Sequence, residues 1–341
     1  MSNGCIIYSG TFPFRWKLAK ALTFLSPPLL CFVSLSTPTS FVNVWTEPLQ
    51  ASLPQLMIGH DNGLSSGDTE CAARCATMYI NNAFQSGLNL QTLLRQMNTF
   101  ASEMRQYKQF MPLRLLTLYI QSVLNLINVD TDDPVLLTGE AMNEQSFLEE
   151  VISNGIKLLL CQFYFRKMKH AYLFERHDVA AKAIIKGREI KSASLLLPKF
   201  EGCTYVYFEG LTAFSLAACS YDDADGDKWC FISDEAIEKM ESWAEESSWN
   251  CKHKLEHLKA EKCAVEGSLE EASSHFSRAL ELAKKHRFAH EEALIAERYG
   301  AFLLQEGNDA AARDQYERAR DNYLRWGAMR KVKDIEQIFR S

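Results

Sequence analysis

Residues 267–279 read GSLEEASSHFSRA and residues 307–319 read GNDAAARDQYERA, so one pattern occurs twice, 40 residues apart. The pattern consists of a glycine, an alanine, an aromatic residue and a second alanine at fixed spacing. These positions are Gly267, Ala272, Phe276 and Ala279 in the first copy and Gly307, Ala312, Tyr316 and Ala319 in the second. Such a repeat is typical of tetratricopeptide-type helix pairs.

Each residue type in the repeat has a physical role. The glycine turns the chain between two helices, the alanines let the helix axes approach to about 8–10 Å, and the ring fills the groove beside them. One helix pair cannot bury its apolar face alone, so several pairs must stack. The sequence therefore predicts an all-α fold of antiparallel helix pairs, stacked as a tetratricopeptide-like right-handed solenoid.

The composition is that of a globular protein without a basic surface. Of 341 residues, 47% are hydrophobic and 23% charged, and the net charge is -6. This charge balance, without a stripe of basic and aromatic residues, argues against nucleic acid as a partner. Residues 201–250 hold twelve acids against two lysines, which indicates either a solvated face or a basic partner.

The ten cysteines are scattered along the chain without a paired framework. Most lie in apolar helical patterns, where they would act as small buried side chains in a reducing compartment. We therefore expect a cytoplasmic protein.

The N-terminal segment allows two interpretations. No charged residue falls between Lys20 and Glu47, so a signal peptide or membrane anchor is one possibility. However, Pro27 and Pro28 interrupt the apolar run, and the serines and threonines after it are too polar to span a bilayer. We favour a degraded first repeat or N-terminal extension over residues 1–40, and a membrane association is not expected.

Two further regions follow this extension. Residues 41–200 are expected to be divergent helical repeats, and residues 201–341 to be repeats with the clear signature and a C-terminal capping helix that includes Trp326. Apolar periodicity predicts the helices of the first and middle parts at 45–58, 69–86, 90–104, 113–129, 146–174, 200–219, 233–249 and 251–265. Turns are expected at 59–68 and 130–134, and an acidic loop at 221–229. Glu175 occupies the turn-glycine position of a weakened copy of the repeat.

Three local patterns could carry chemistry. His253, Glu256 and His257 fit the H-x-x-E-H order of some zinc peptidases, but the helix that carries them is already explained by packing. The acidic loop around Gly226 lacks the carboxylates that a calcium loop requires at its ends, and Cys71 and Cys75 have no second ligand pair nearby. The phosphate-binding loops, kinase motifs and nucleophile elbows of common enzymes do not occur in the sequence. We therefore predict no catalytic residues, no metal site and no cofactor.

Several stretches resemble one known family more closely than the repeat alone does. They are Asn250, His253 and Lys254, then Ala260 and Glu261, the run 289–293, and above all residues 323–328 followed by Lys331 and Val332. Trp45–Leu49, Gly63, Asp68 and Ala72 are similar to its earlier part. The chain resembles, over residues 12–340 and most closely after residue 245, the helical repeat region of large multi-domain signalling kinases. Those proteins join a Ser/Thr-kinase-like domain, an AAA-type ATPase, this repeat region, a GAF sensor and a histidine kinase.

The resemblance implies a sensor arm that works between an ATPase and a kinase, in a chain without the catalytic domains of that family. The leading interpretation is a non-catalytic scaffold that binds a protein partner, such as an ATPase or kinase domain, on its concave face. His253 and Lys254 are the candidate contact residues, because they lie on the first helix of the clearest repeat. The alternatives are a fragment of a larger multi-domain kinase, a zinc-dependent hydrolase and a membrane-anchored adaptor.

Overall fold

The computed structural model describes residues 43–190, 200–218 and 224–339. Helix accounts for 83% of these residues, and no strand occurs among them, which confirms the all-α class. The predicted extension over residues 1–40 lies outside the described residues. The elements of the first part are α4 (Val44–Thr46), η2 (Leu49–Ala51), α5 (Ser52–Ser66), α6 (Thr69–Gln85), α7 (Leu90–Gln106), α8 (Phe110–Ile127), α9 (Glu144–Ser153), α10 (Lys157–Leu173) and α11 (His177–Glu189). Those of the second part are α13 (Phe200–Ala217), α14 (Ala224–Glu246), α15 (Ser248–Glu266), α16 (Leu269–Lys285), α17 (Ala289–Gln305), α18 (Asp309–Trp326) and α19 (Met329–Ile338).

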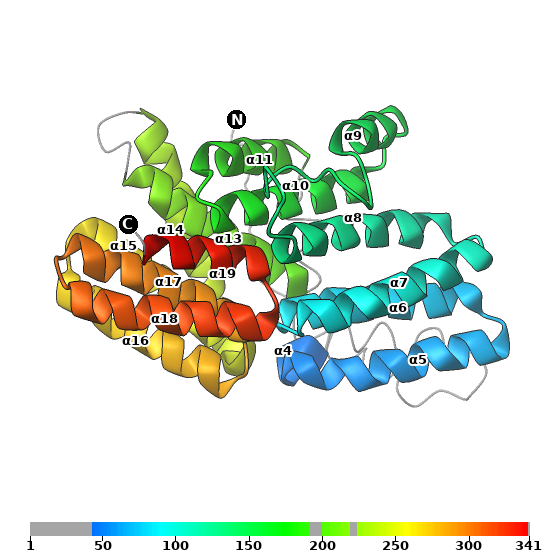
Figure 1. The fold of residues 1–341 in the computed structure, drawn as a ribbon, viewed down its shortest axis with the longest axis horizontal. Helices are drawn as coiled ribbons and strands as arrows, with labels where there is room; N and C mark the ends of the chain where they lie inside the picture. Colours follow the sequence, from blue (N-terminus) through cyan, green and yellow to red (C-terminus); the bar gives the residue numbers. More distant parts are fainter. Residues whose placement is uncertain (1–42, 191–199, 219–223, 340–341) are drawn as a thin grey trace, which may run out of the picture.

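Consecutive helices pack as pairs. Within the described residues the pairs are α5 with α6, α7 with α8, α10 with α11, α13 with α14, α15 with α16, and α17 with α18. Neighbouring pairs also touch, so each pair covers the apolar face of the next. Figure 1 shows these helices side by side, with α9 set apart at one corner and α19 lying beside the last pair.

The repeat signature explains the C-terminal pairs. The glycines that open the two copies have φ values of 78° and 74° and lie between the helices of a pair. The signature alanines are almost completely buried, and Phe276 is 1% exposed. A side chain at Gly300 of α17 would lie 3.2 Å from the ring of Tyr316, so that helix approaches α18 closely where the signature ring packs.

The weakened copy near Glu175 has the same turn. Glu175 has φ 55° and joins α10 to α11, so a glutamate adopts the left-handed conformation that glycine favours. The alanine and isoleucine that follow at the expected spacing, Ala180 and Ile184, are both fully buried. The segment therefore forms a helix pair, α10 with α11, whose inner face is buried.

The turn expected over residues 59–68 is shorter in the structure. The glycine-rich stretch 59–68 was expected to be a turn, but α5 continues through it to Ser66. Gly63 lies inside that helix because its missing side chain makes room for α6, since a Cβ there would lie 2.7 Å from the backbone nitrogen of Ala72. Only Gly67, with φ 78°, and Asp68 form the turn.

The single helix expected over 146–174 is two helices, α9 and α10, separated by Gly155 with φ 64°. The acidic segment is helical from Ala224 onward rather than a loop up to 229. Its acids at 234, 235 and 241 form ion pairs with Lys262, Arg188 and Lys259. These acids therefore join α14 to its neighbours.

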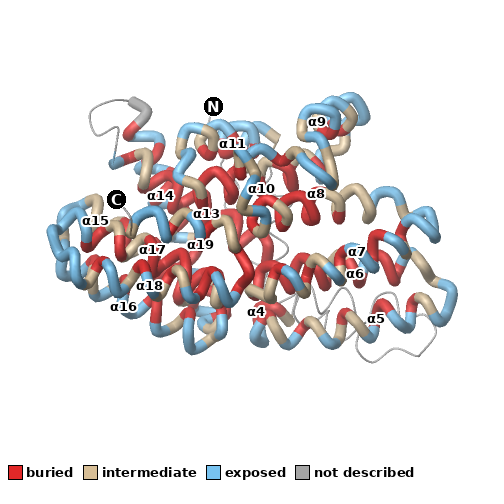
Figure 2. Tube along the Cα trace, viewed as in Figure 1, coloured by how far each residue is buried: buried red, intermediate tan, exposed pale blue. Residues whose placement is uncertain are grey.

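The two ends of the helical array meet, although they are far apart in the sequence. The side chain of Asn250 in α15 accepts from the backbone N–H of Leu49 at 3.1 Å and donates to the carbonyls of Val44 and Glu47 at 2.8 and 2.9 Å. In Figure 2 the buried segments are concentrated towards the centre, where the early and late helices face one another. The inner faces of the helices are thus packed together.

Trp326 takes part in this closure. Its ring is 1% exposed, and its centroid lies 6.0 Å from that of Phe84 in α6 and 5.2 Å from that of His290. The sequence predicts Trp326 as part of a C-terminal capping helix, and the structure places it at the end of α18, before α19 begins. It packs against a helix from the first part of the chain, so it does more than cover a free end of the array.

Three basic residues of α19 bind backbone carbonyls at or just after the C-terminal ends of earlier helices. Arg330 donates to the carbonyls of Val129 and Thr131 just after α8, and Lys333 donates to Val129 at 3.0 Å. Lys331 donates to the carbonyl at the end of α10 at 2.7 Å. Cations are favourable at helix C-termini because the last carbonyls lack intrahelical partners.

Among the described residues, one helix is long and apolar enough to cross a membrane. It is α8, with a mean hydropathy of 1.4, and 50% of it is buried within the protein. It packs on α6, α7, α10 and α19. A core helix of a helical protein has these properties.

Candidate functional site

The two residues that the sequence singled out for partner binding lie in the interior. His253 and Lys254 of α15 are both completely buried. Lys254 Nζ donates to the Glu291 carboxylate of α17 at 2.7 Å and to the carbonyl of Asn250 at 3.1 Å. The His253 ring bonds the same carboxylate through Nε2 and stacks on Phe288, with ring centroids 4.6 Å apart. The expectation that both side chains lie on an open surface is wrong.

Electrostatics fixes the charge states of this group. Burial alone would raise the pKa of Glu291, but Lys254 and His253 more than offset it, so the pKa lies below its usual range. Burial and the adjacent Lys254 lower the pKa of His253 to about 4. At neutral pH the group is therefore an ion pair of Lys254 with Glu291, to which a neutral imidazole donates a hydrogen bond.

The H-x-x-E-H residues do not converge. His253 is bonded to Glu291, whereas His257 Nδ1 lies 2.6 Å from the hydroxyl of Tyr207. Glu256 lies 2.8 Å from the ring of His275. In the part of the chain that the structure describes, no group of three His, Cys, Asp or Glu side chains is arranged to hold a metal ion. The geometry therefore does not favour the zinc hydrolase alternative.

Further ion pairs join helices that are distant in the sequence. Arg166 of α10 contacts Glu201 of α13 at 3.2 Å, and its guanidinium lies 3.6 Å from the centre of the Tyr119 ring. Arg298 of α17 binds Glu261 of α15 through two hydrogen bonds of 2.8 and 3.1 Å. In each pair a cation of one helix offsets the charge of a buried carboxylate on another helix.

One buried cation has no hydrogen-bond partner among the described residues. Lys169 of α10 is 3% exposed, and its Nζ lies 4.4 Å from the centre of the Phe84 ring and 5.3 Å from that of Phe208. Burial lowers the pKa of this lysine to about 7. The aromatic faces attract its charged form, but they do not replace the water that it lost.

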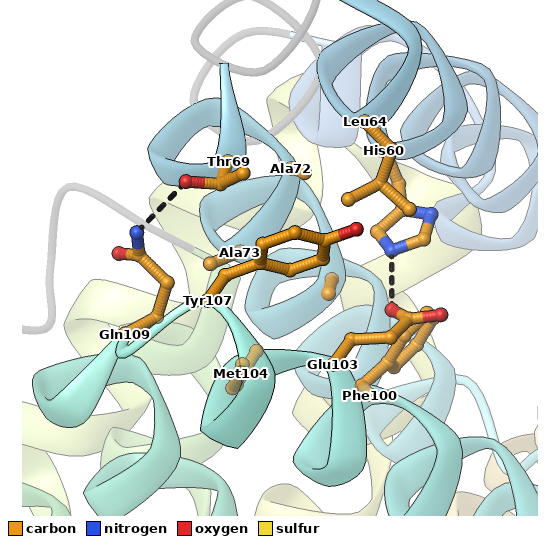
Figure 3. Close-up of a pocket in the computed structure, with 11 residues that line it drawn as sticks. His60, Leu64, Thr69, Ala72, Ala73, Phe100, Glu103, Met104, Tyr107 and Gln109 are labelled. Atoms are coloured by element: carbon orange, nitrogen blue, oxygen red, sulfur yellow. Dashed lines mark hydrogen bonds and ion pairs between the residues drawn. The ribbon is translucent and has the colours of Figure 1, made fainter. Parts of the chain in front are cut away.

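A small pocket near the tips of α5, α6 and α7 has no room for a ligand. Its volume is about 10 Å³, the space of a single water. Figure 3 shows His60 beside the pocket with its ring directed at Glu103, 2.9 Å away, while Gln109 reaches Thr69 at 3.1 Å. The polar groups here join three helices to one another.

A larger groove of about 450 Å³ lies beside α19. Its other walls are the connection from α8 to α9 and the turn from α10 to α11. The apolar part of its lining includes Leu173, Phe174 and Ile338. The volume falls within the range of about 300–1,000 Å³ that is usual for ligand pockets.

The groove is lined by five carboxylates and three cations. The carboxylates are Asp132, Asp133, Glu175, Glu297 and Asp334, and the cations are Arg176, Arg330 and Lys331. The two cations from α19 are occupied, because Arg330 binds Asp334 and two carbonyls, while Lys331 binds Glu297 at 2.6 Å. Arg176 lies 3.6 Å from Asp178. Within the described residues, Asp132 and Glu175 have no ion-pair partner.

Comparison of the chain with models of known protein families gives no match, and comparison with curated protein sequences gives none either.

The groove residues were not identified from the sequence. Asp132 belongs to a stretch that was recognised only as a break between helices, and Glu175 was noticed as a replacement for the turn glycine. Neither position indicates that α19, which begins at Met329, packs beside them. The sequence does indicate α19, because Gly327 ends the preceding helix and basic residues follow it. It does not indicate which carbonyls and carboxylates those basic residues bind.

Proposed function

We propose that the chain is a non-catalytic protein-interaction module of a signal-transduction system, whose helix pairs form a tetratricopeptide-like right-handed solenoid. The paired helices with buried signature alanines and rings support this architecture. The resemblance to the repeat region of multi-domain kinases supports the signalling role. We further propose that the partner is an ATPase or kinase domain, in the same or a separate chain, and that the module acts in the cytoplasm.

The observation that carries the proposal is the groove beside α19. Because the inner faces of the helices are packed together, the concave surface that a solenoid would normally offer is occupied by its own side chains. The groove is an accessible hollow of about 450 Å³, and segments distant in the sequence build its walls. A partner that binds there would contact both the last helix and the middle of the chain.

Site-specific photo-cross-linking tests this function. A photoreactive amino acid replaces Arg176 at the groove or, as a control, Leu269 on α16, which is 42% exposed and lies outside the groove lining. We expect the full chain to be cross-linked in cell extract to a protein with an ATPase or kinase domain from the groove position only. Equal labelling from both positions, or none from either, would contradict the proposal.

The non-catalytic part is tested in the same preparation. ATPase and peptidase activities of the purified chain should not exceed background. Turnover that accompanies the folded protein and disappears in the variant His257→Ala would show that the chain is an enzyme.

A further inference from the structure

We propose that the groove beside α19 binds a basic segment of the protein partner and receives an arginine or lysine side chain between Asp132 and Glu175. This inference rests on the proposed function, because it names the chemistry of the partner for that groove. Its basis is the charge of the lining. The two carboxylates come from two segments of the lining, one from the α8–α9 connection and one from the α10–α11 turn.

The cations of the groove are already paired within the protein, whereas two of its carboxylates are not. Its cations from α19 are held by the carbonyls after α8 and at the end of α10, and by Asp334 and Glu297. The carboxylate of Asp133 accepts from the backbone N–H of Val135 at 2.9 Å. This leaves Asp132 and Glu175, both exposed, as the charged groups of the lining with neither an ion pair nor a side-chain hydrogen bond in the part of the chain that the structure describes. An arriving cation meets free acceptors, whereas an arriving anion meets cations that are already neutralised.

The apolar part of the lining also suits a basic segment. Phe174 and Ile338 supply accessible apolar surface on which the methylene groups of a long basic side chain can lie. A guanidinium can form paired hydrogen bonds with a carboxylate, which gives orientation as well as attraction. The groove therefore fits an extended segment with a basic residue better than an acidic or a purely apolar one.

Fluorescence anisotropy with the full-length chain tests this inference directly. The ligand is a labelled glycine-rich peptide with two arginines, and its control is the same peptide with citrulline, which keeps the shape and removes the charge. We expect saturable binding of the arginine peptide and at least about tenfold weaker binding of the citrulline peptide. Binding should weaken as salt shortens the Debye length from about 10 Å at 0.1 M to about 3 Å at 1 M.

Two double variants locate the binding. Asp132→Asn with Glu175→Gln removes the free carboxylates of the groove, and we expect it to lower affinity for the arginine peptide about tenfold or more. Asp314→Asn with Glu317→Gln makes the same change of net charge on the exposed face of α18 and should change affinity less than about twofold. Equal loss in both variants, equal binding of the citrulline peptide, or no binding would overturn the inference.

The cross-linking result separates this inference from the proposed function. If the groove position captures a partner domain while the groove variant binds the arginine peptide normally, the function stands and the basic-segment inference fails. If neither the partner nor the peptide reaches the groove, both fail.

Discussion

Two regions of this molecule are rich in charge, and they differ in what surrounds them. In the interior, Lys254 and Glu291 are buried away from water and form an ion pair with one another. At the groove, Asp132 and Glu175 keep their contact with water and have no ionic partner among the described residues. Charged side chains therefore hold helices together in the first region, whereas the carboxylates of the second remain available for a partner.

The comparison also shows why polar residues on the inner face of a repeat do not by themselves mark a binding surface. Each helix pair brings a few polar side chains to that face, and the curvature of the array decides whether they meet water or one another. Here Asn250 and Trp326 join the late helices to the early ones, so the inner face is closed. Substitutions inside should change stability, while those at the groove should change binding.

The largest effect is expected for Glu291→Ala. This change leaves the fully buried Lys254 without its carboxylate, and breaking a buried pair costs about 3–5 kcal/mol of unfolding free energy. Urea denaturation measures the loss, with Glu281→Ala on the exposed face of α16 as a control that should change stability by less than about 0.5 kcal/mol. Similar stability of both variants would mean that the pair is open to water.

Lys169→Met should have the opposite sign and stabilise the protein at neutral pH. The buried ammonium of Lys169 has no hydrogen-bond partner among the described residues, and methionine would keep the aliphatic contacts. Replacement of buried charge by an apolar side chain of similar size stabilises proteins by about 1–4 kcal/mol in favourable cases. A lower denaturation midpoint in the variant would contradict the assignment of this lysine to a dry site.

The pH dependence of that gain follows from the lowered pKa of Lys169. The pKa is about 7 in the folded protein, whereas a solvated lysine of the unfolded chain has the usual value of 10.5, so the unfolded chain binds more protons between these values. The unfolding free energy therefore rises with pH across this window in the parent protein, and this contribution is absent in the variant. Denaturation at pH 6, 7, 8 and 9 should show a difference that is constant below about 7 and shrinks above it. Glu291 and Arg166 also act on this lysine and are present in both proteins.

A smaller loss is expected for Asn250→Ala. The change leaves the backbone N–H of Leu49 and the carbonyls of Val44 and Glu47 without this side chain's hydrogen bonds, at a cost of about 1–3 kcal/mol. Thermal denaturation measures it against Asn98→Ala, a change at an exposed position of α7. Equal melting temperatures would argue that the contact between α15 and the segment 44–49 is not maintained in solution.

The smallest effect on stability is expected at the groove. Asp132→Asn with Glu175→Gln removes two exposed charges that form no ion pair within the described ranges, so unfolding free energy should change by less than about 0.5 kcal/mol. Denaturation of the same double variant that is used for peptide binding provides the measurement. A loss comparable to that of Glu291→Ala would mean that these carboxylates support the fold, and the contrast between the two regions would fail.

The sequence predicts the local fold well because its signals are local. Helical spacing, Gly267 and Gly307 at the turns, and buried alanines beside Phe276 act over a few residues, and the structure confirms them. Glycine occurs both in turns and where two helices pack closely, so the sequence alone does not decide between them at Gly63. The close approach of α6 in the structure shows that the second reason applies.

The candidate sites were less predictable because they depend on contacts across the whole chain. His253 and Lys254 were correctly placed on a first helix, but their exposure depends on whether successive pairs curve enough for the ends to meet. Asn250 forms a hydrogen bond with Leu49, which lies 201 residues earlier in the chain. The periodicity of the sequence does not predict such a contact. The groove depends on the same closure, since α19 forms one of its walls.

The central claim is that the late helices close the array by packing on the early ones, and hydrogen exchange of Trp326→Ala tests it most directly. The truncated ring no longer contacts Phe84, so amides of Thr69–Gln85, more than 200 residues away in the sequence, should exchange faster in the variant under native conditions. The control Leu324→Ala, at a position 53% exposed on the same helix, should leave that segment unchanged. Faster exchange confined to α17, α18 and α19, with Thr69–Gln85 as protected as in the parent protein, would contradict the closure.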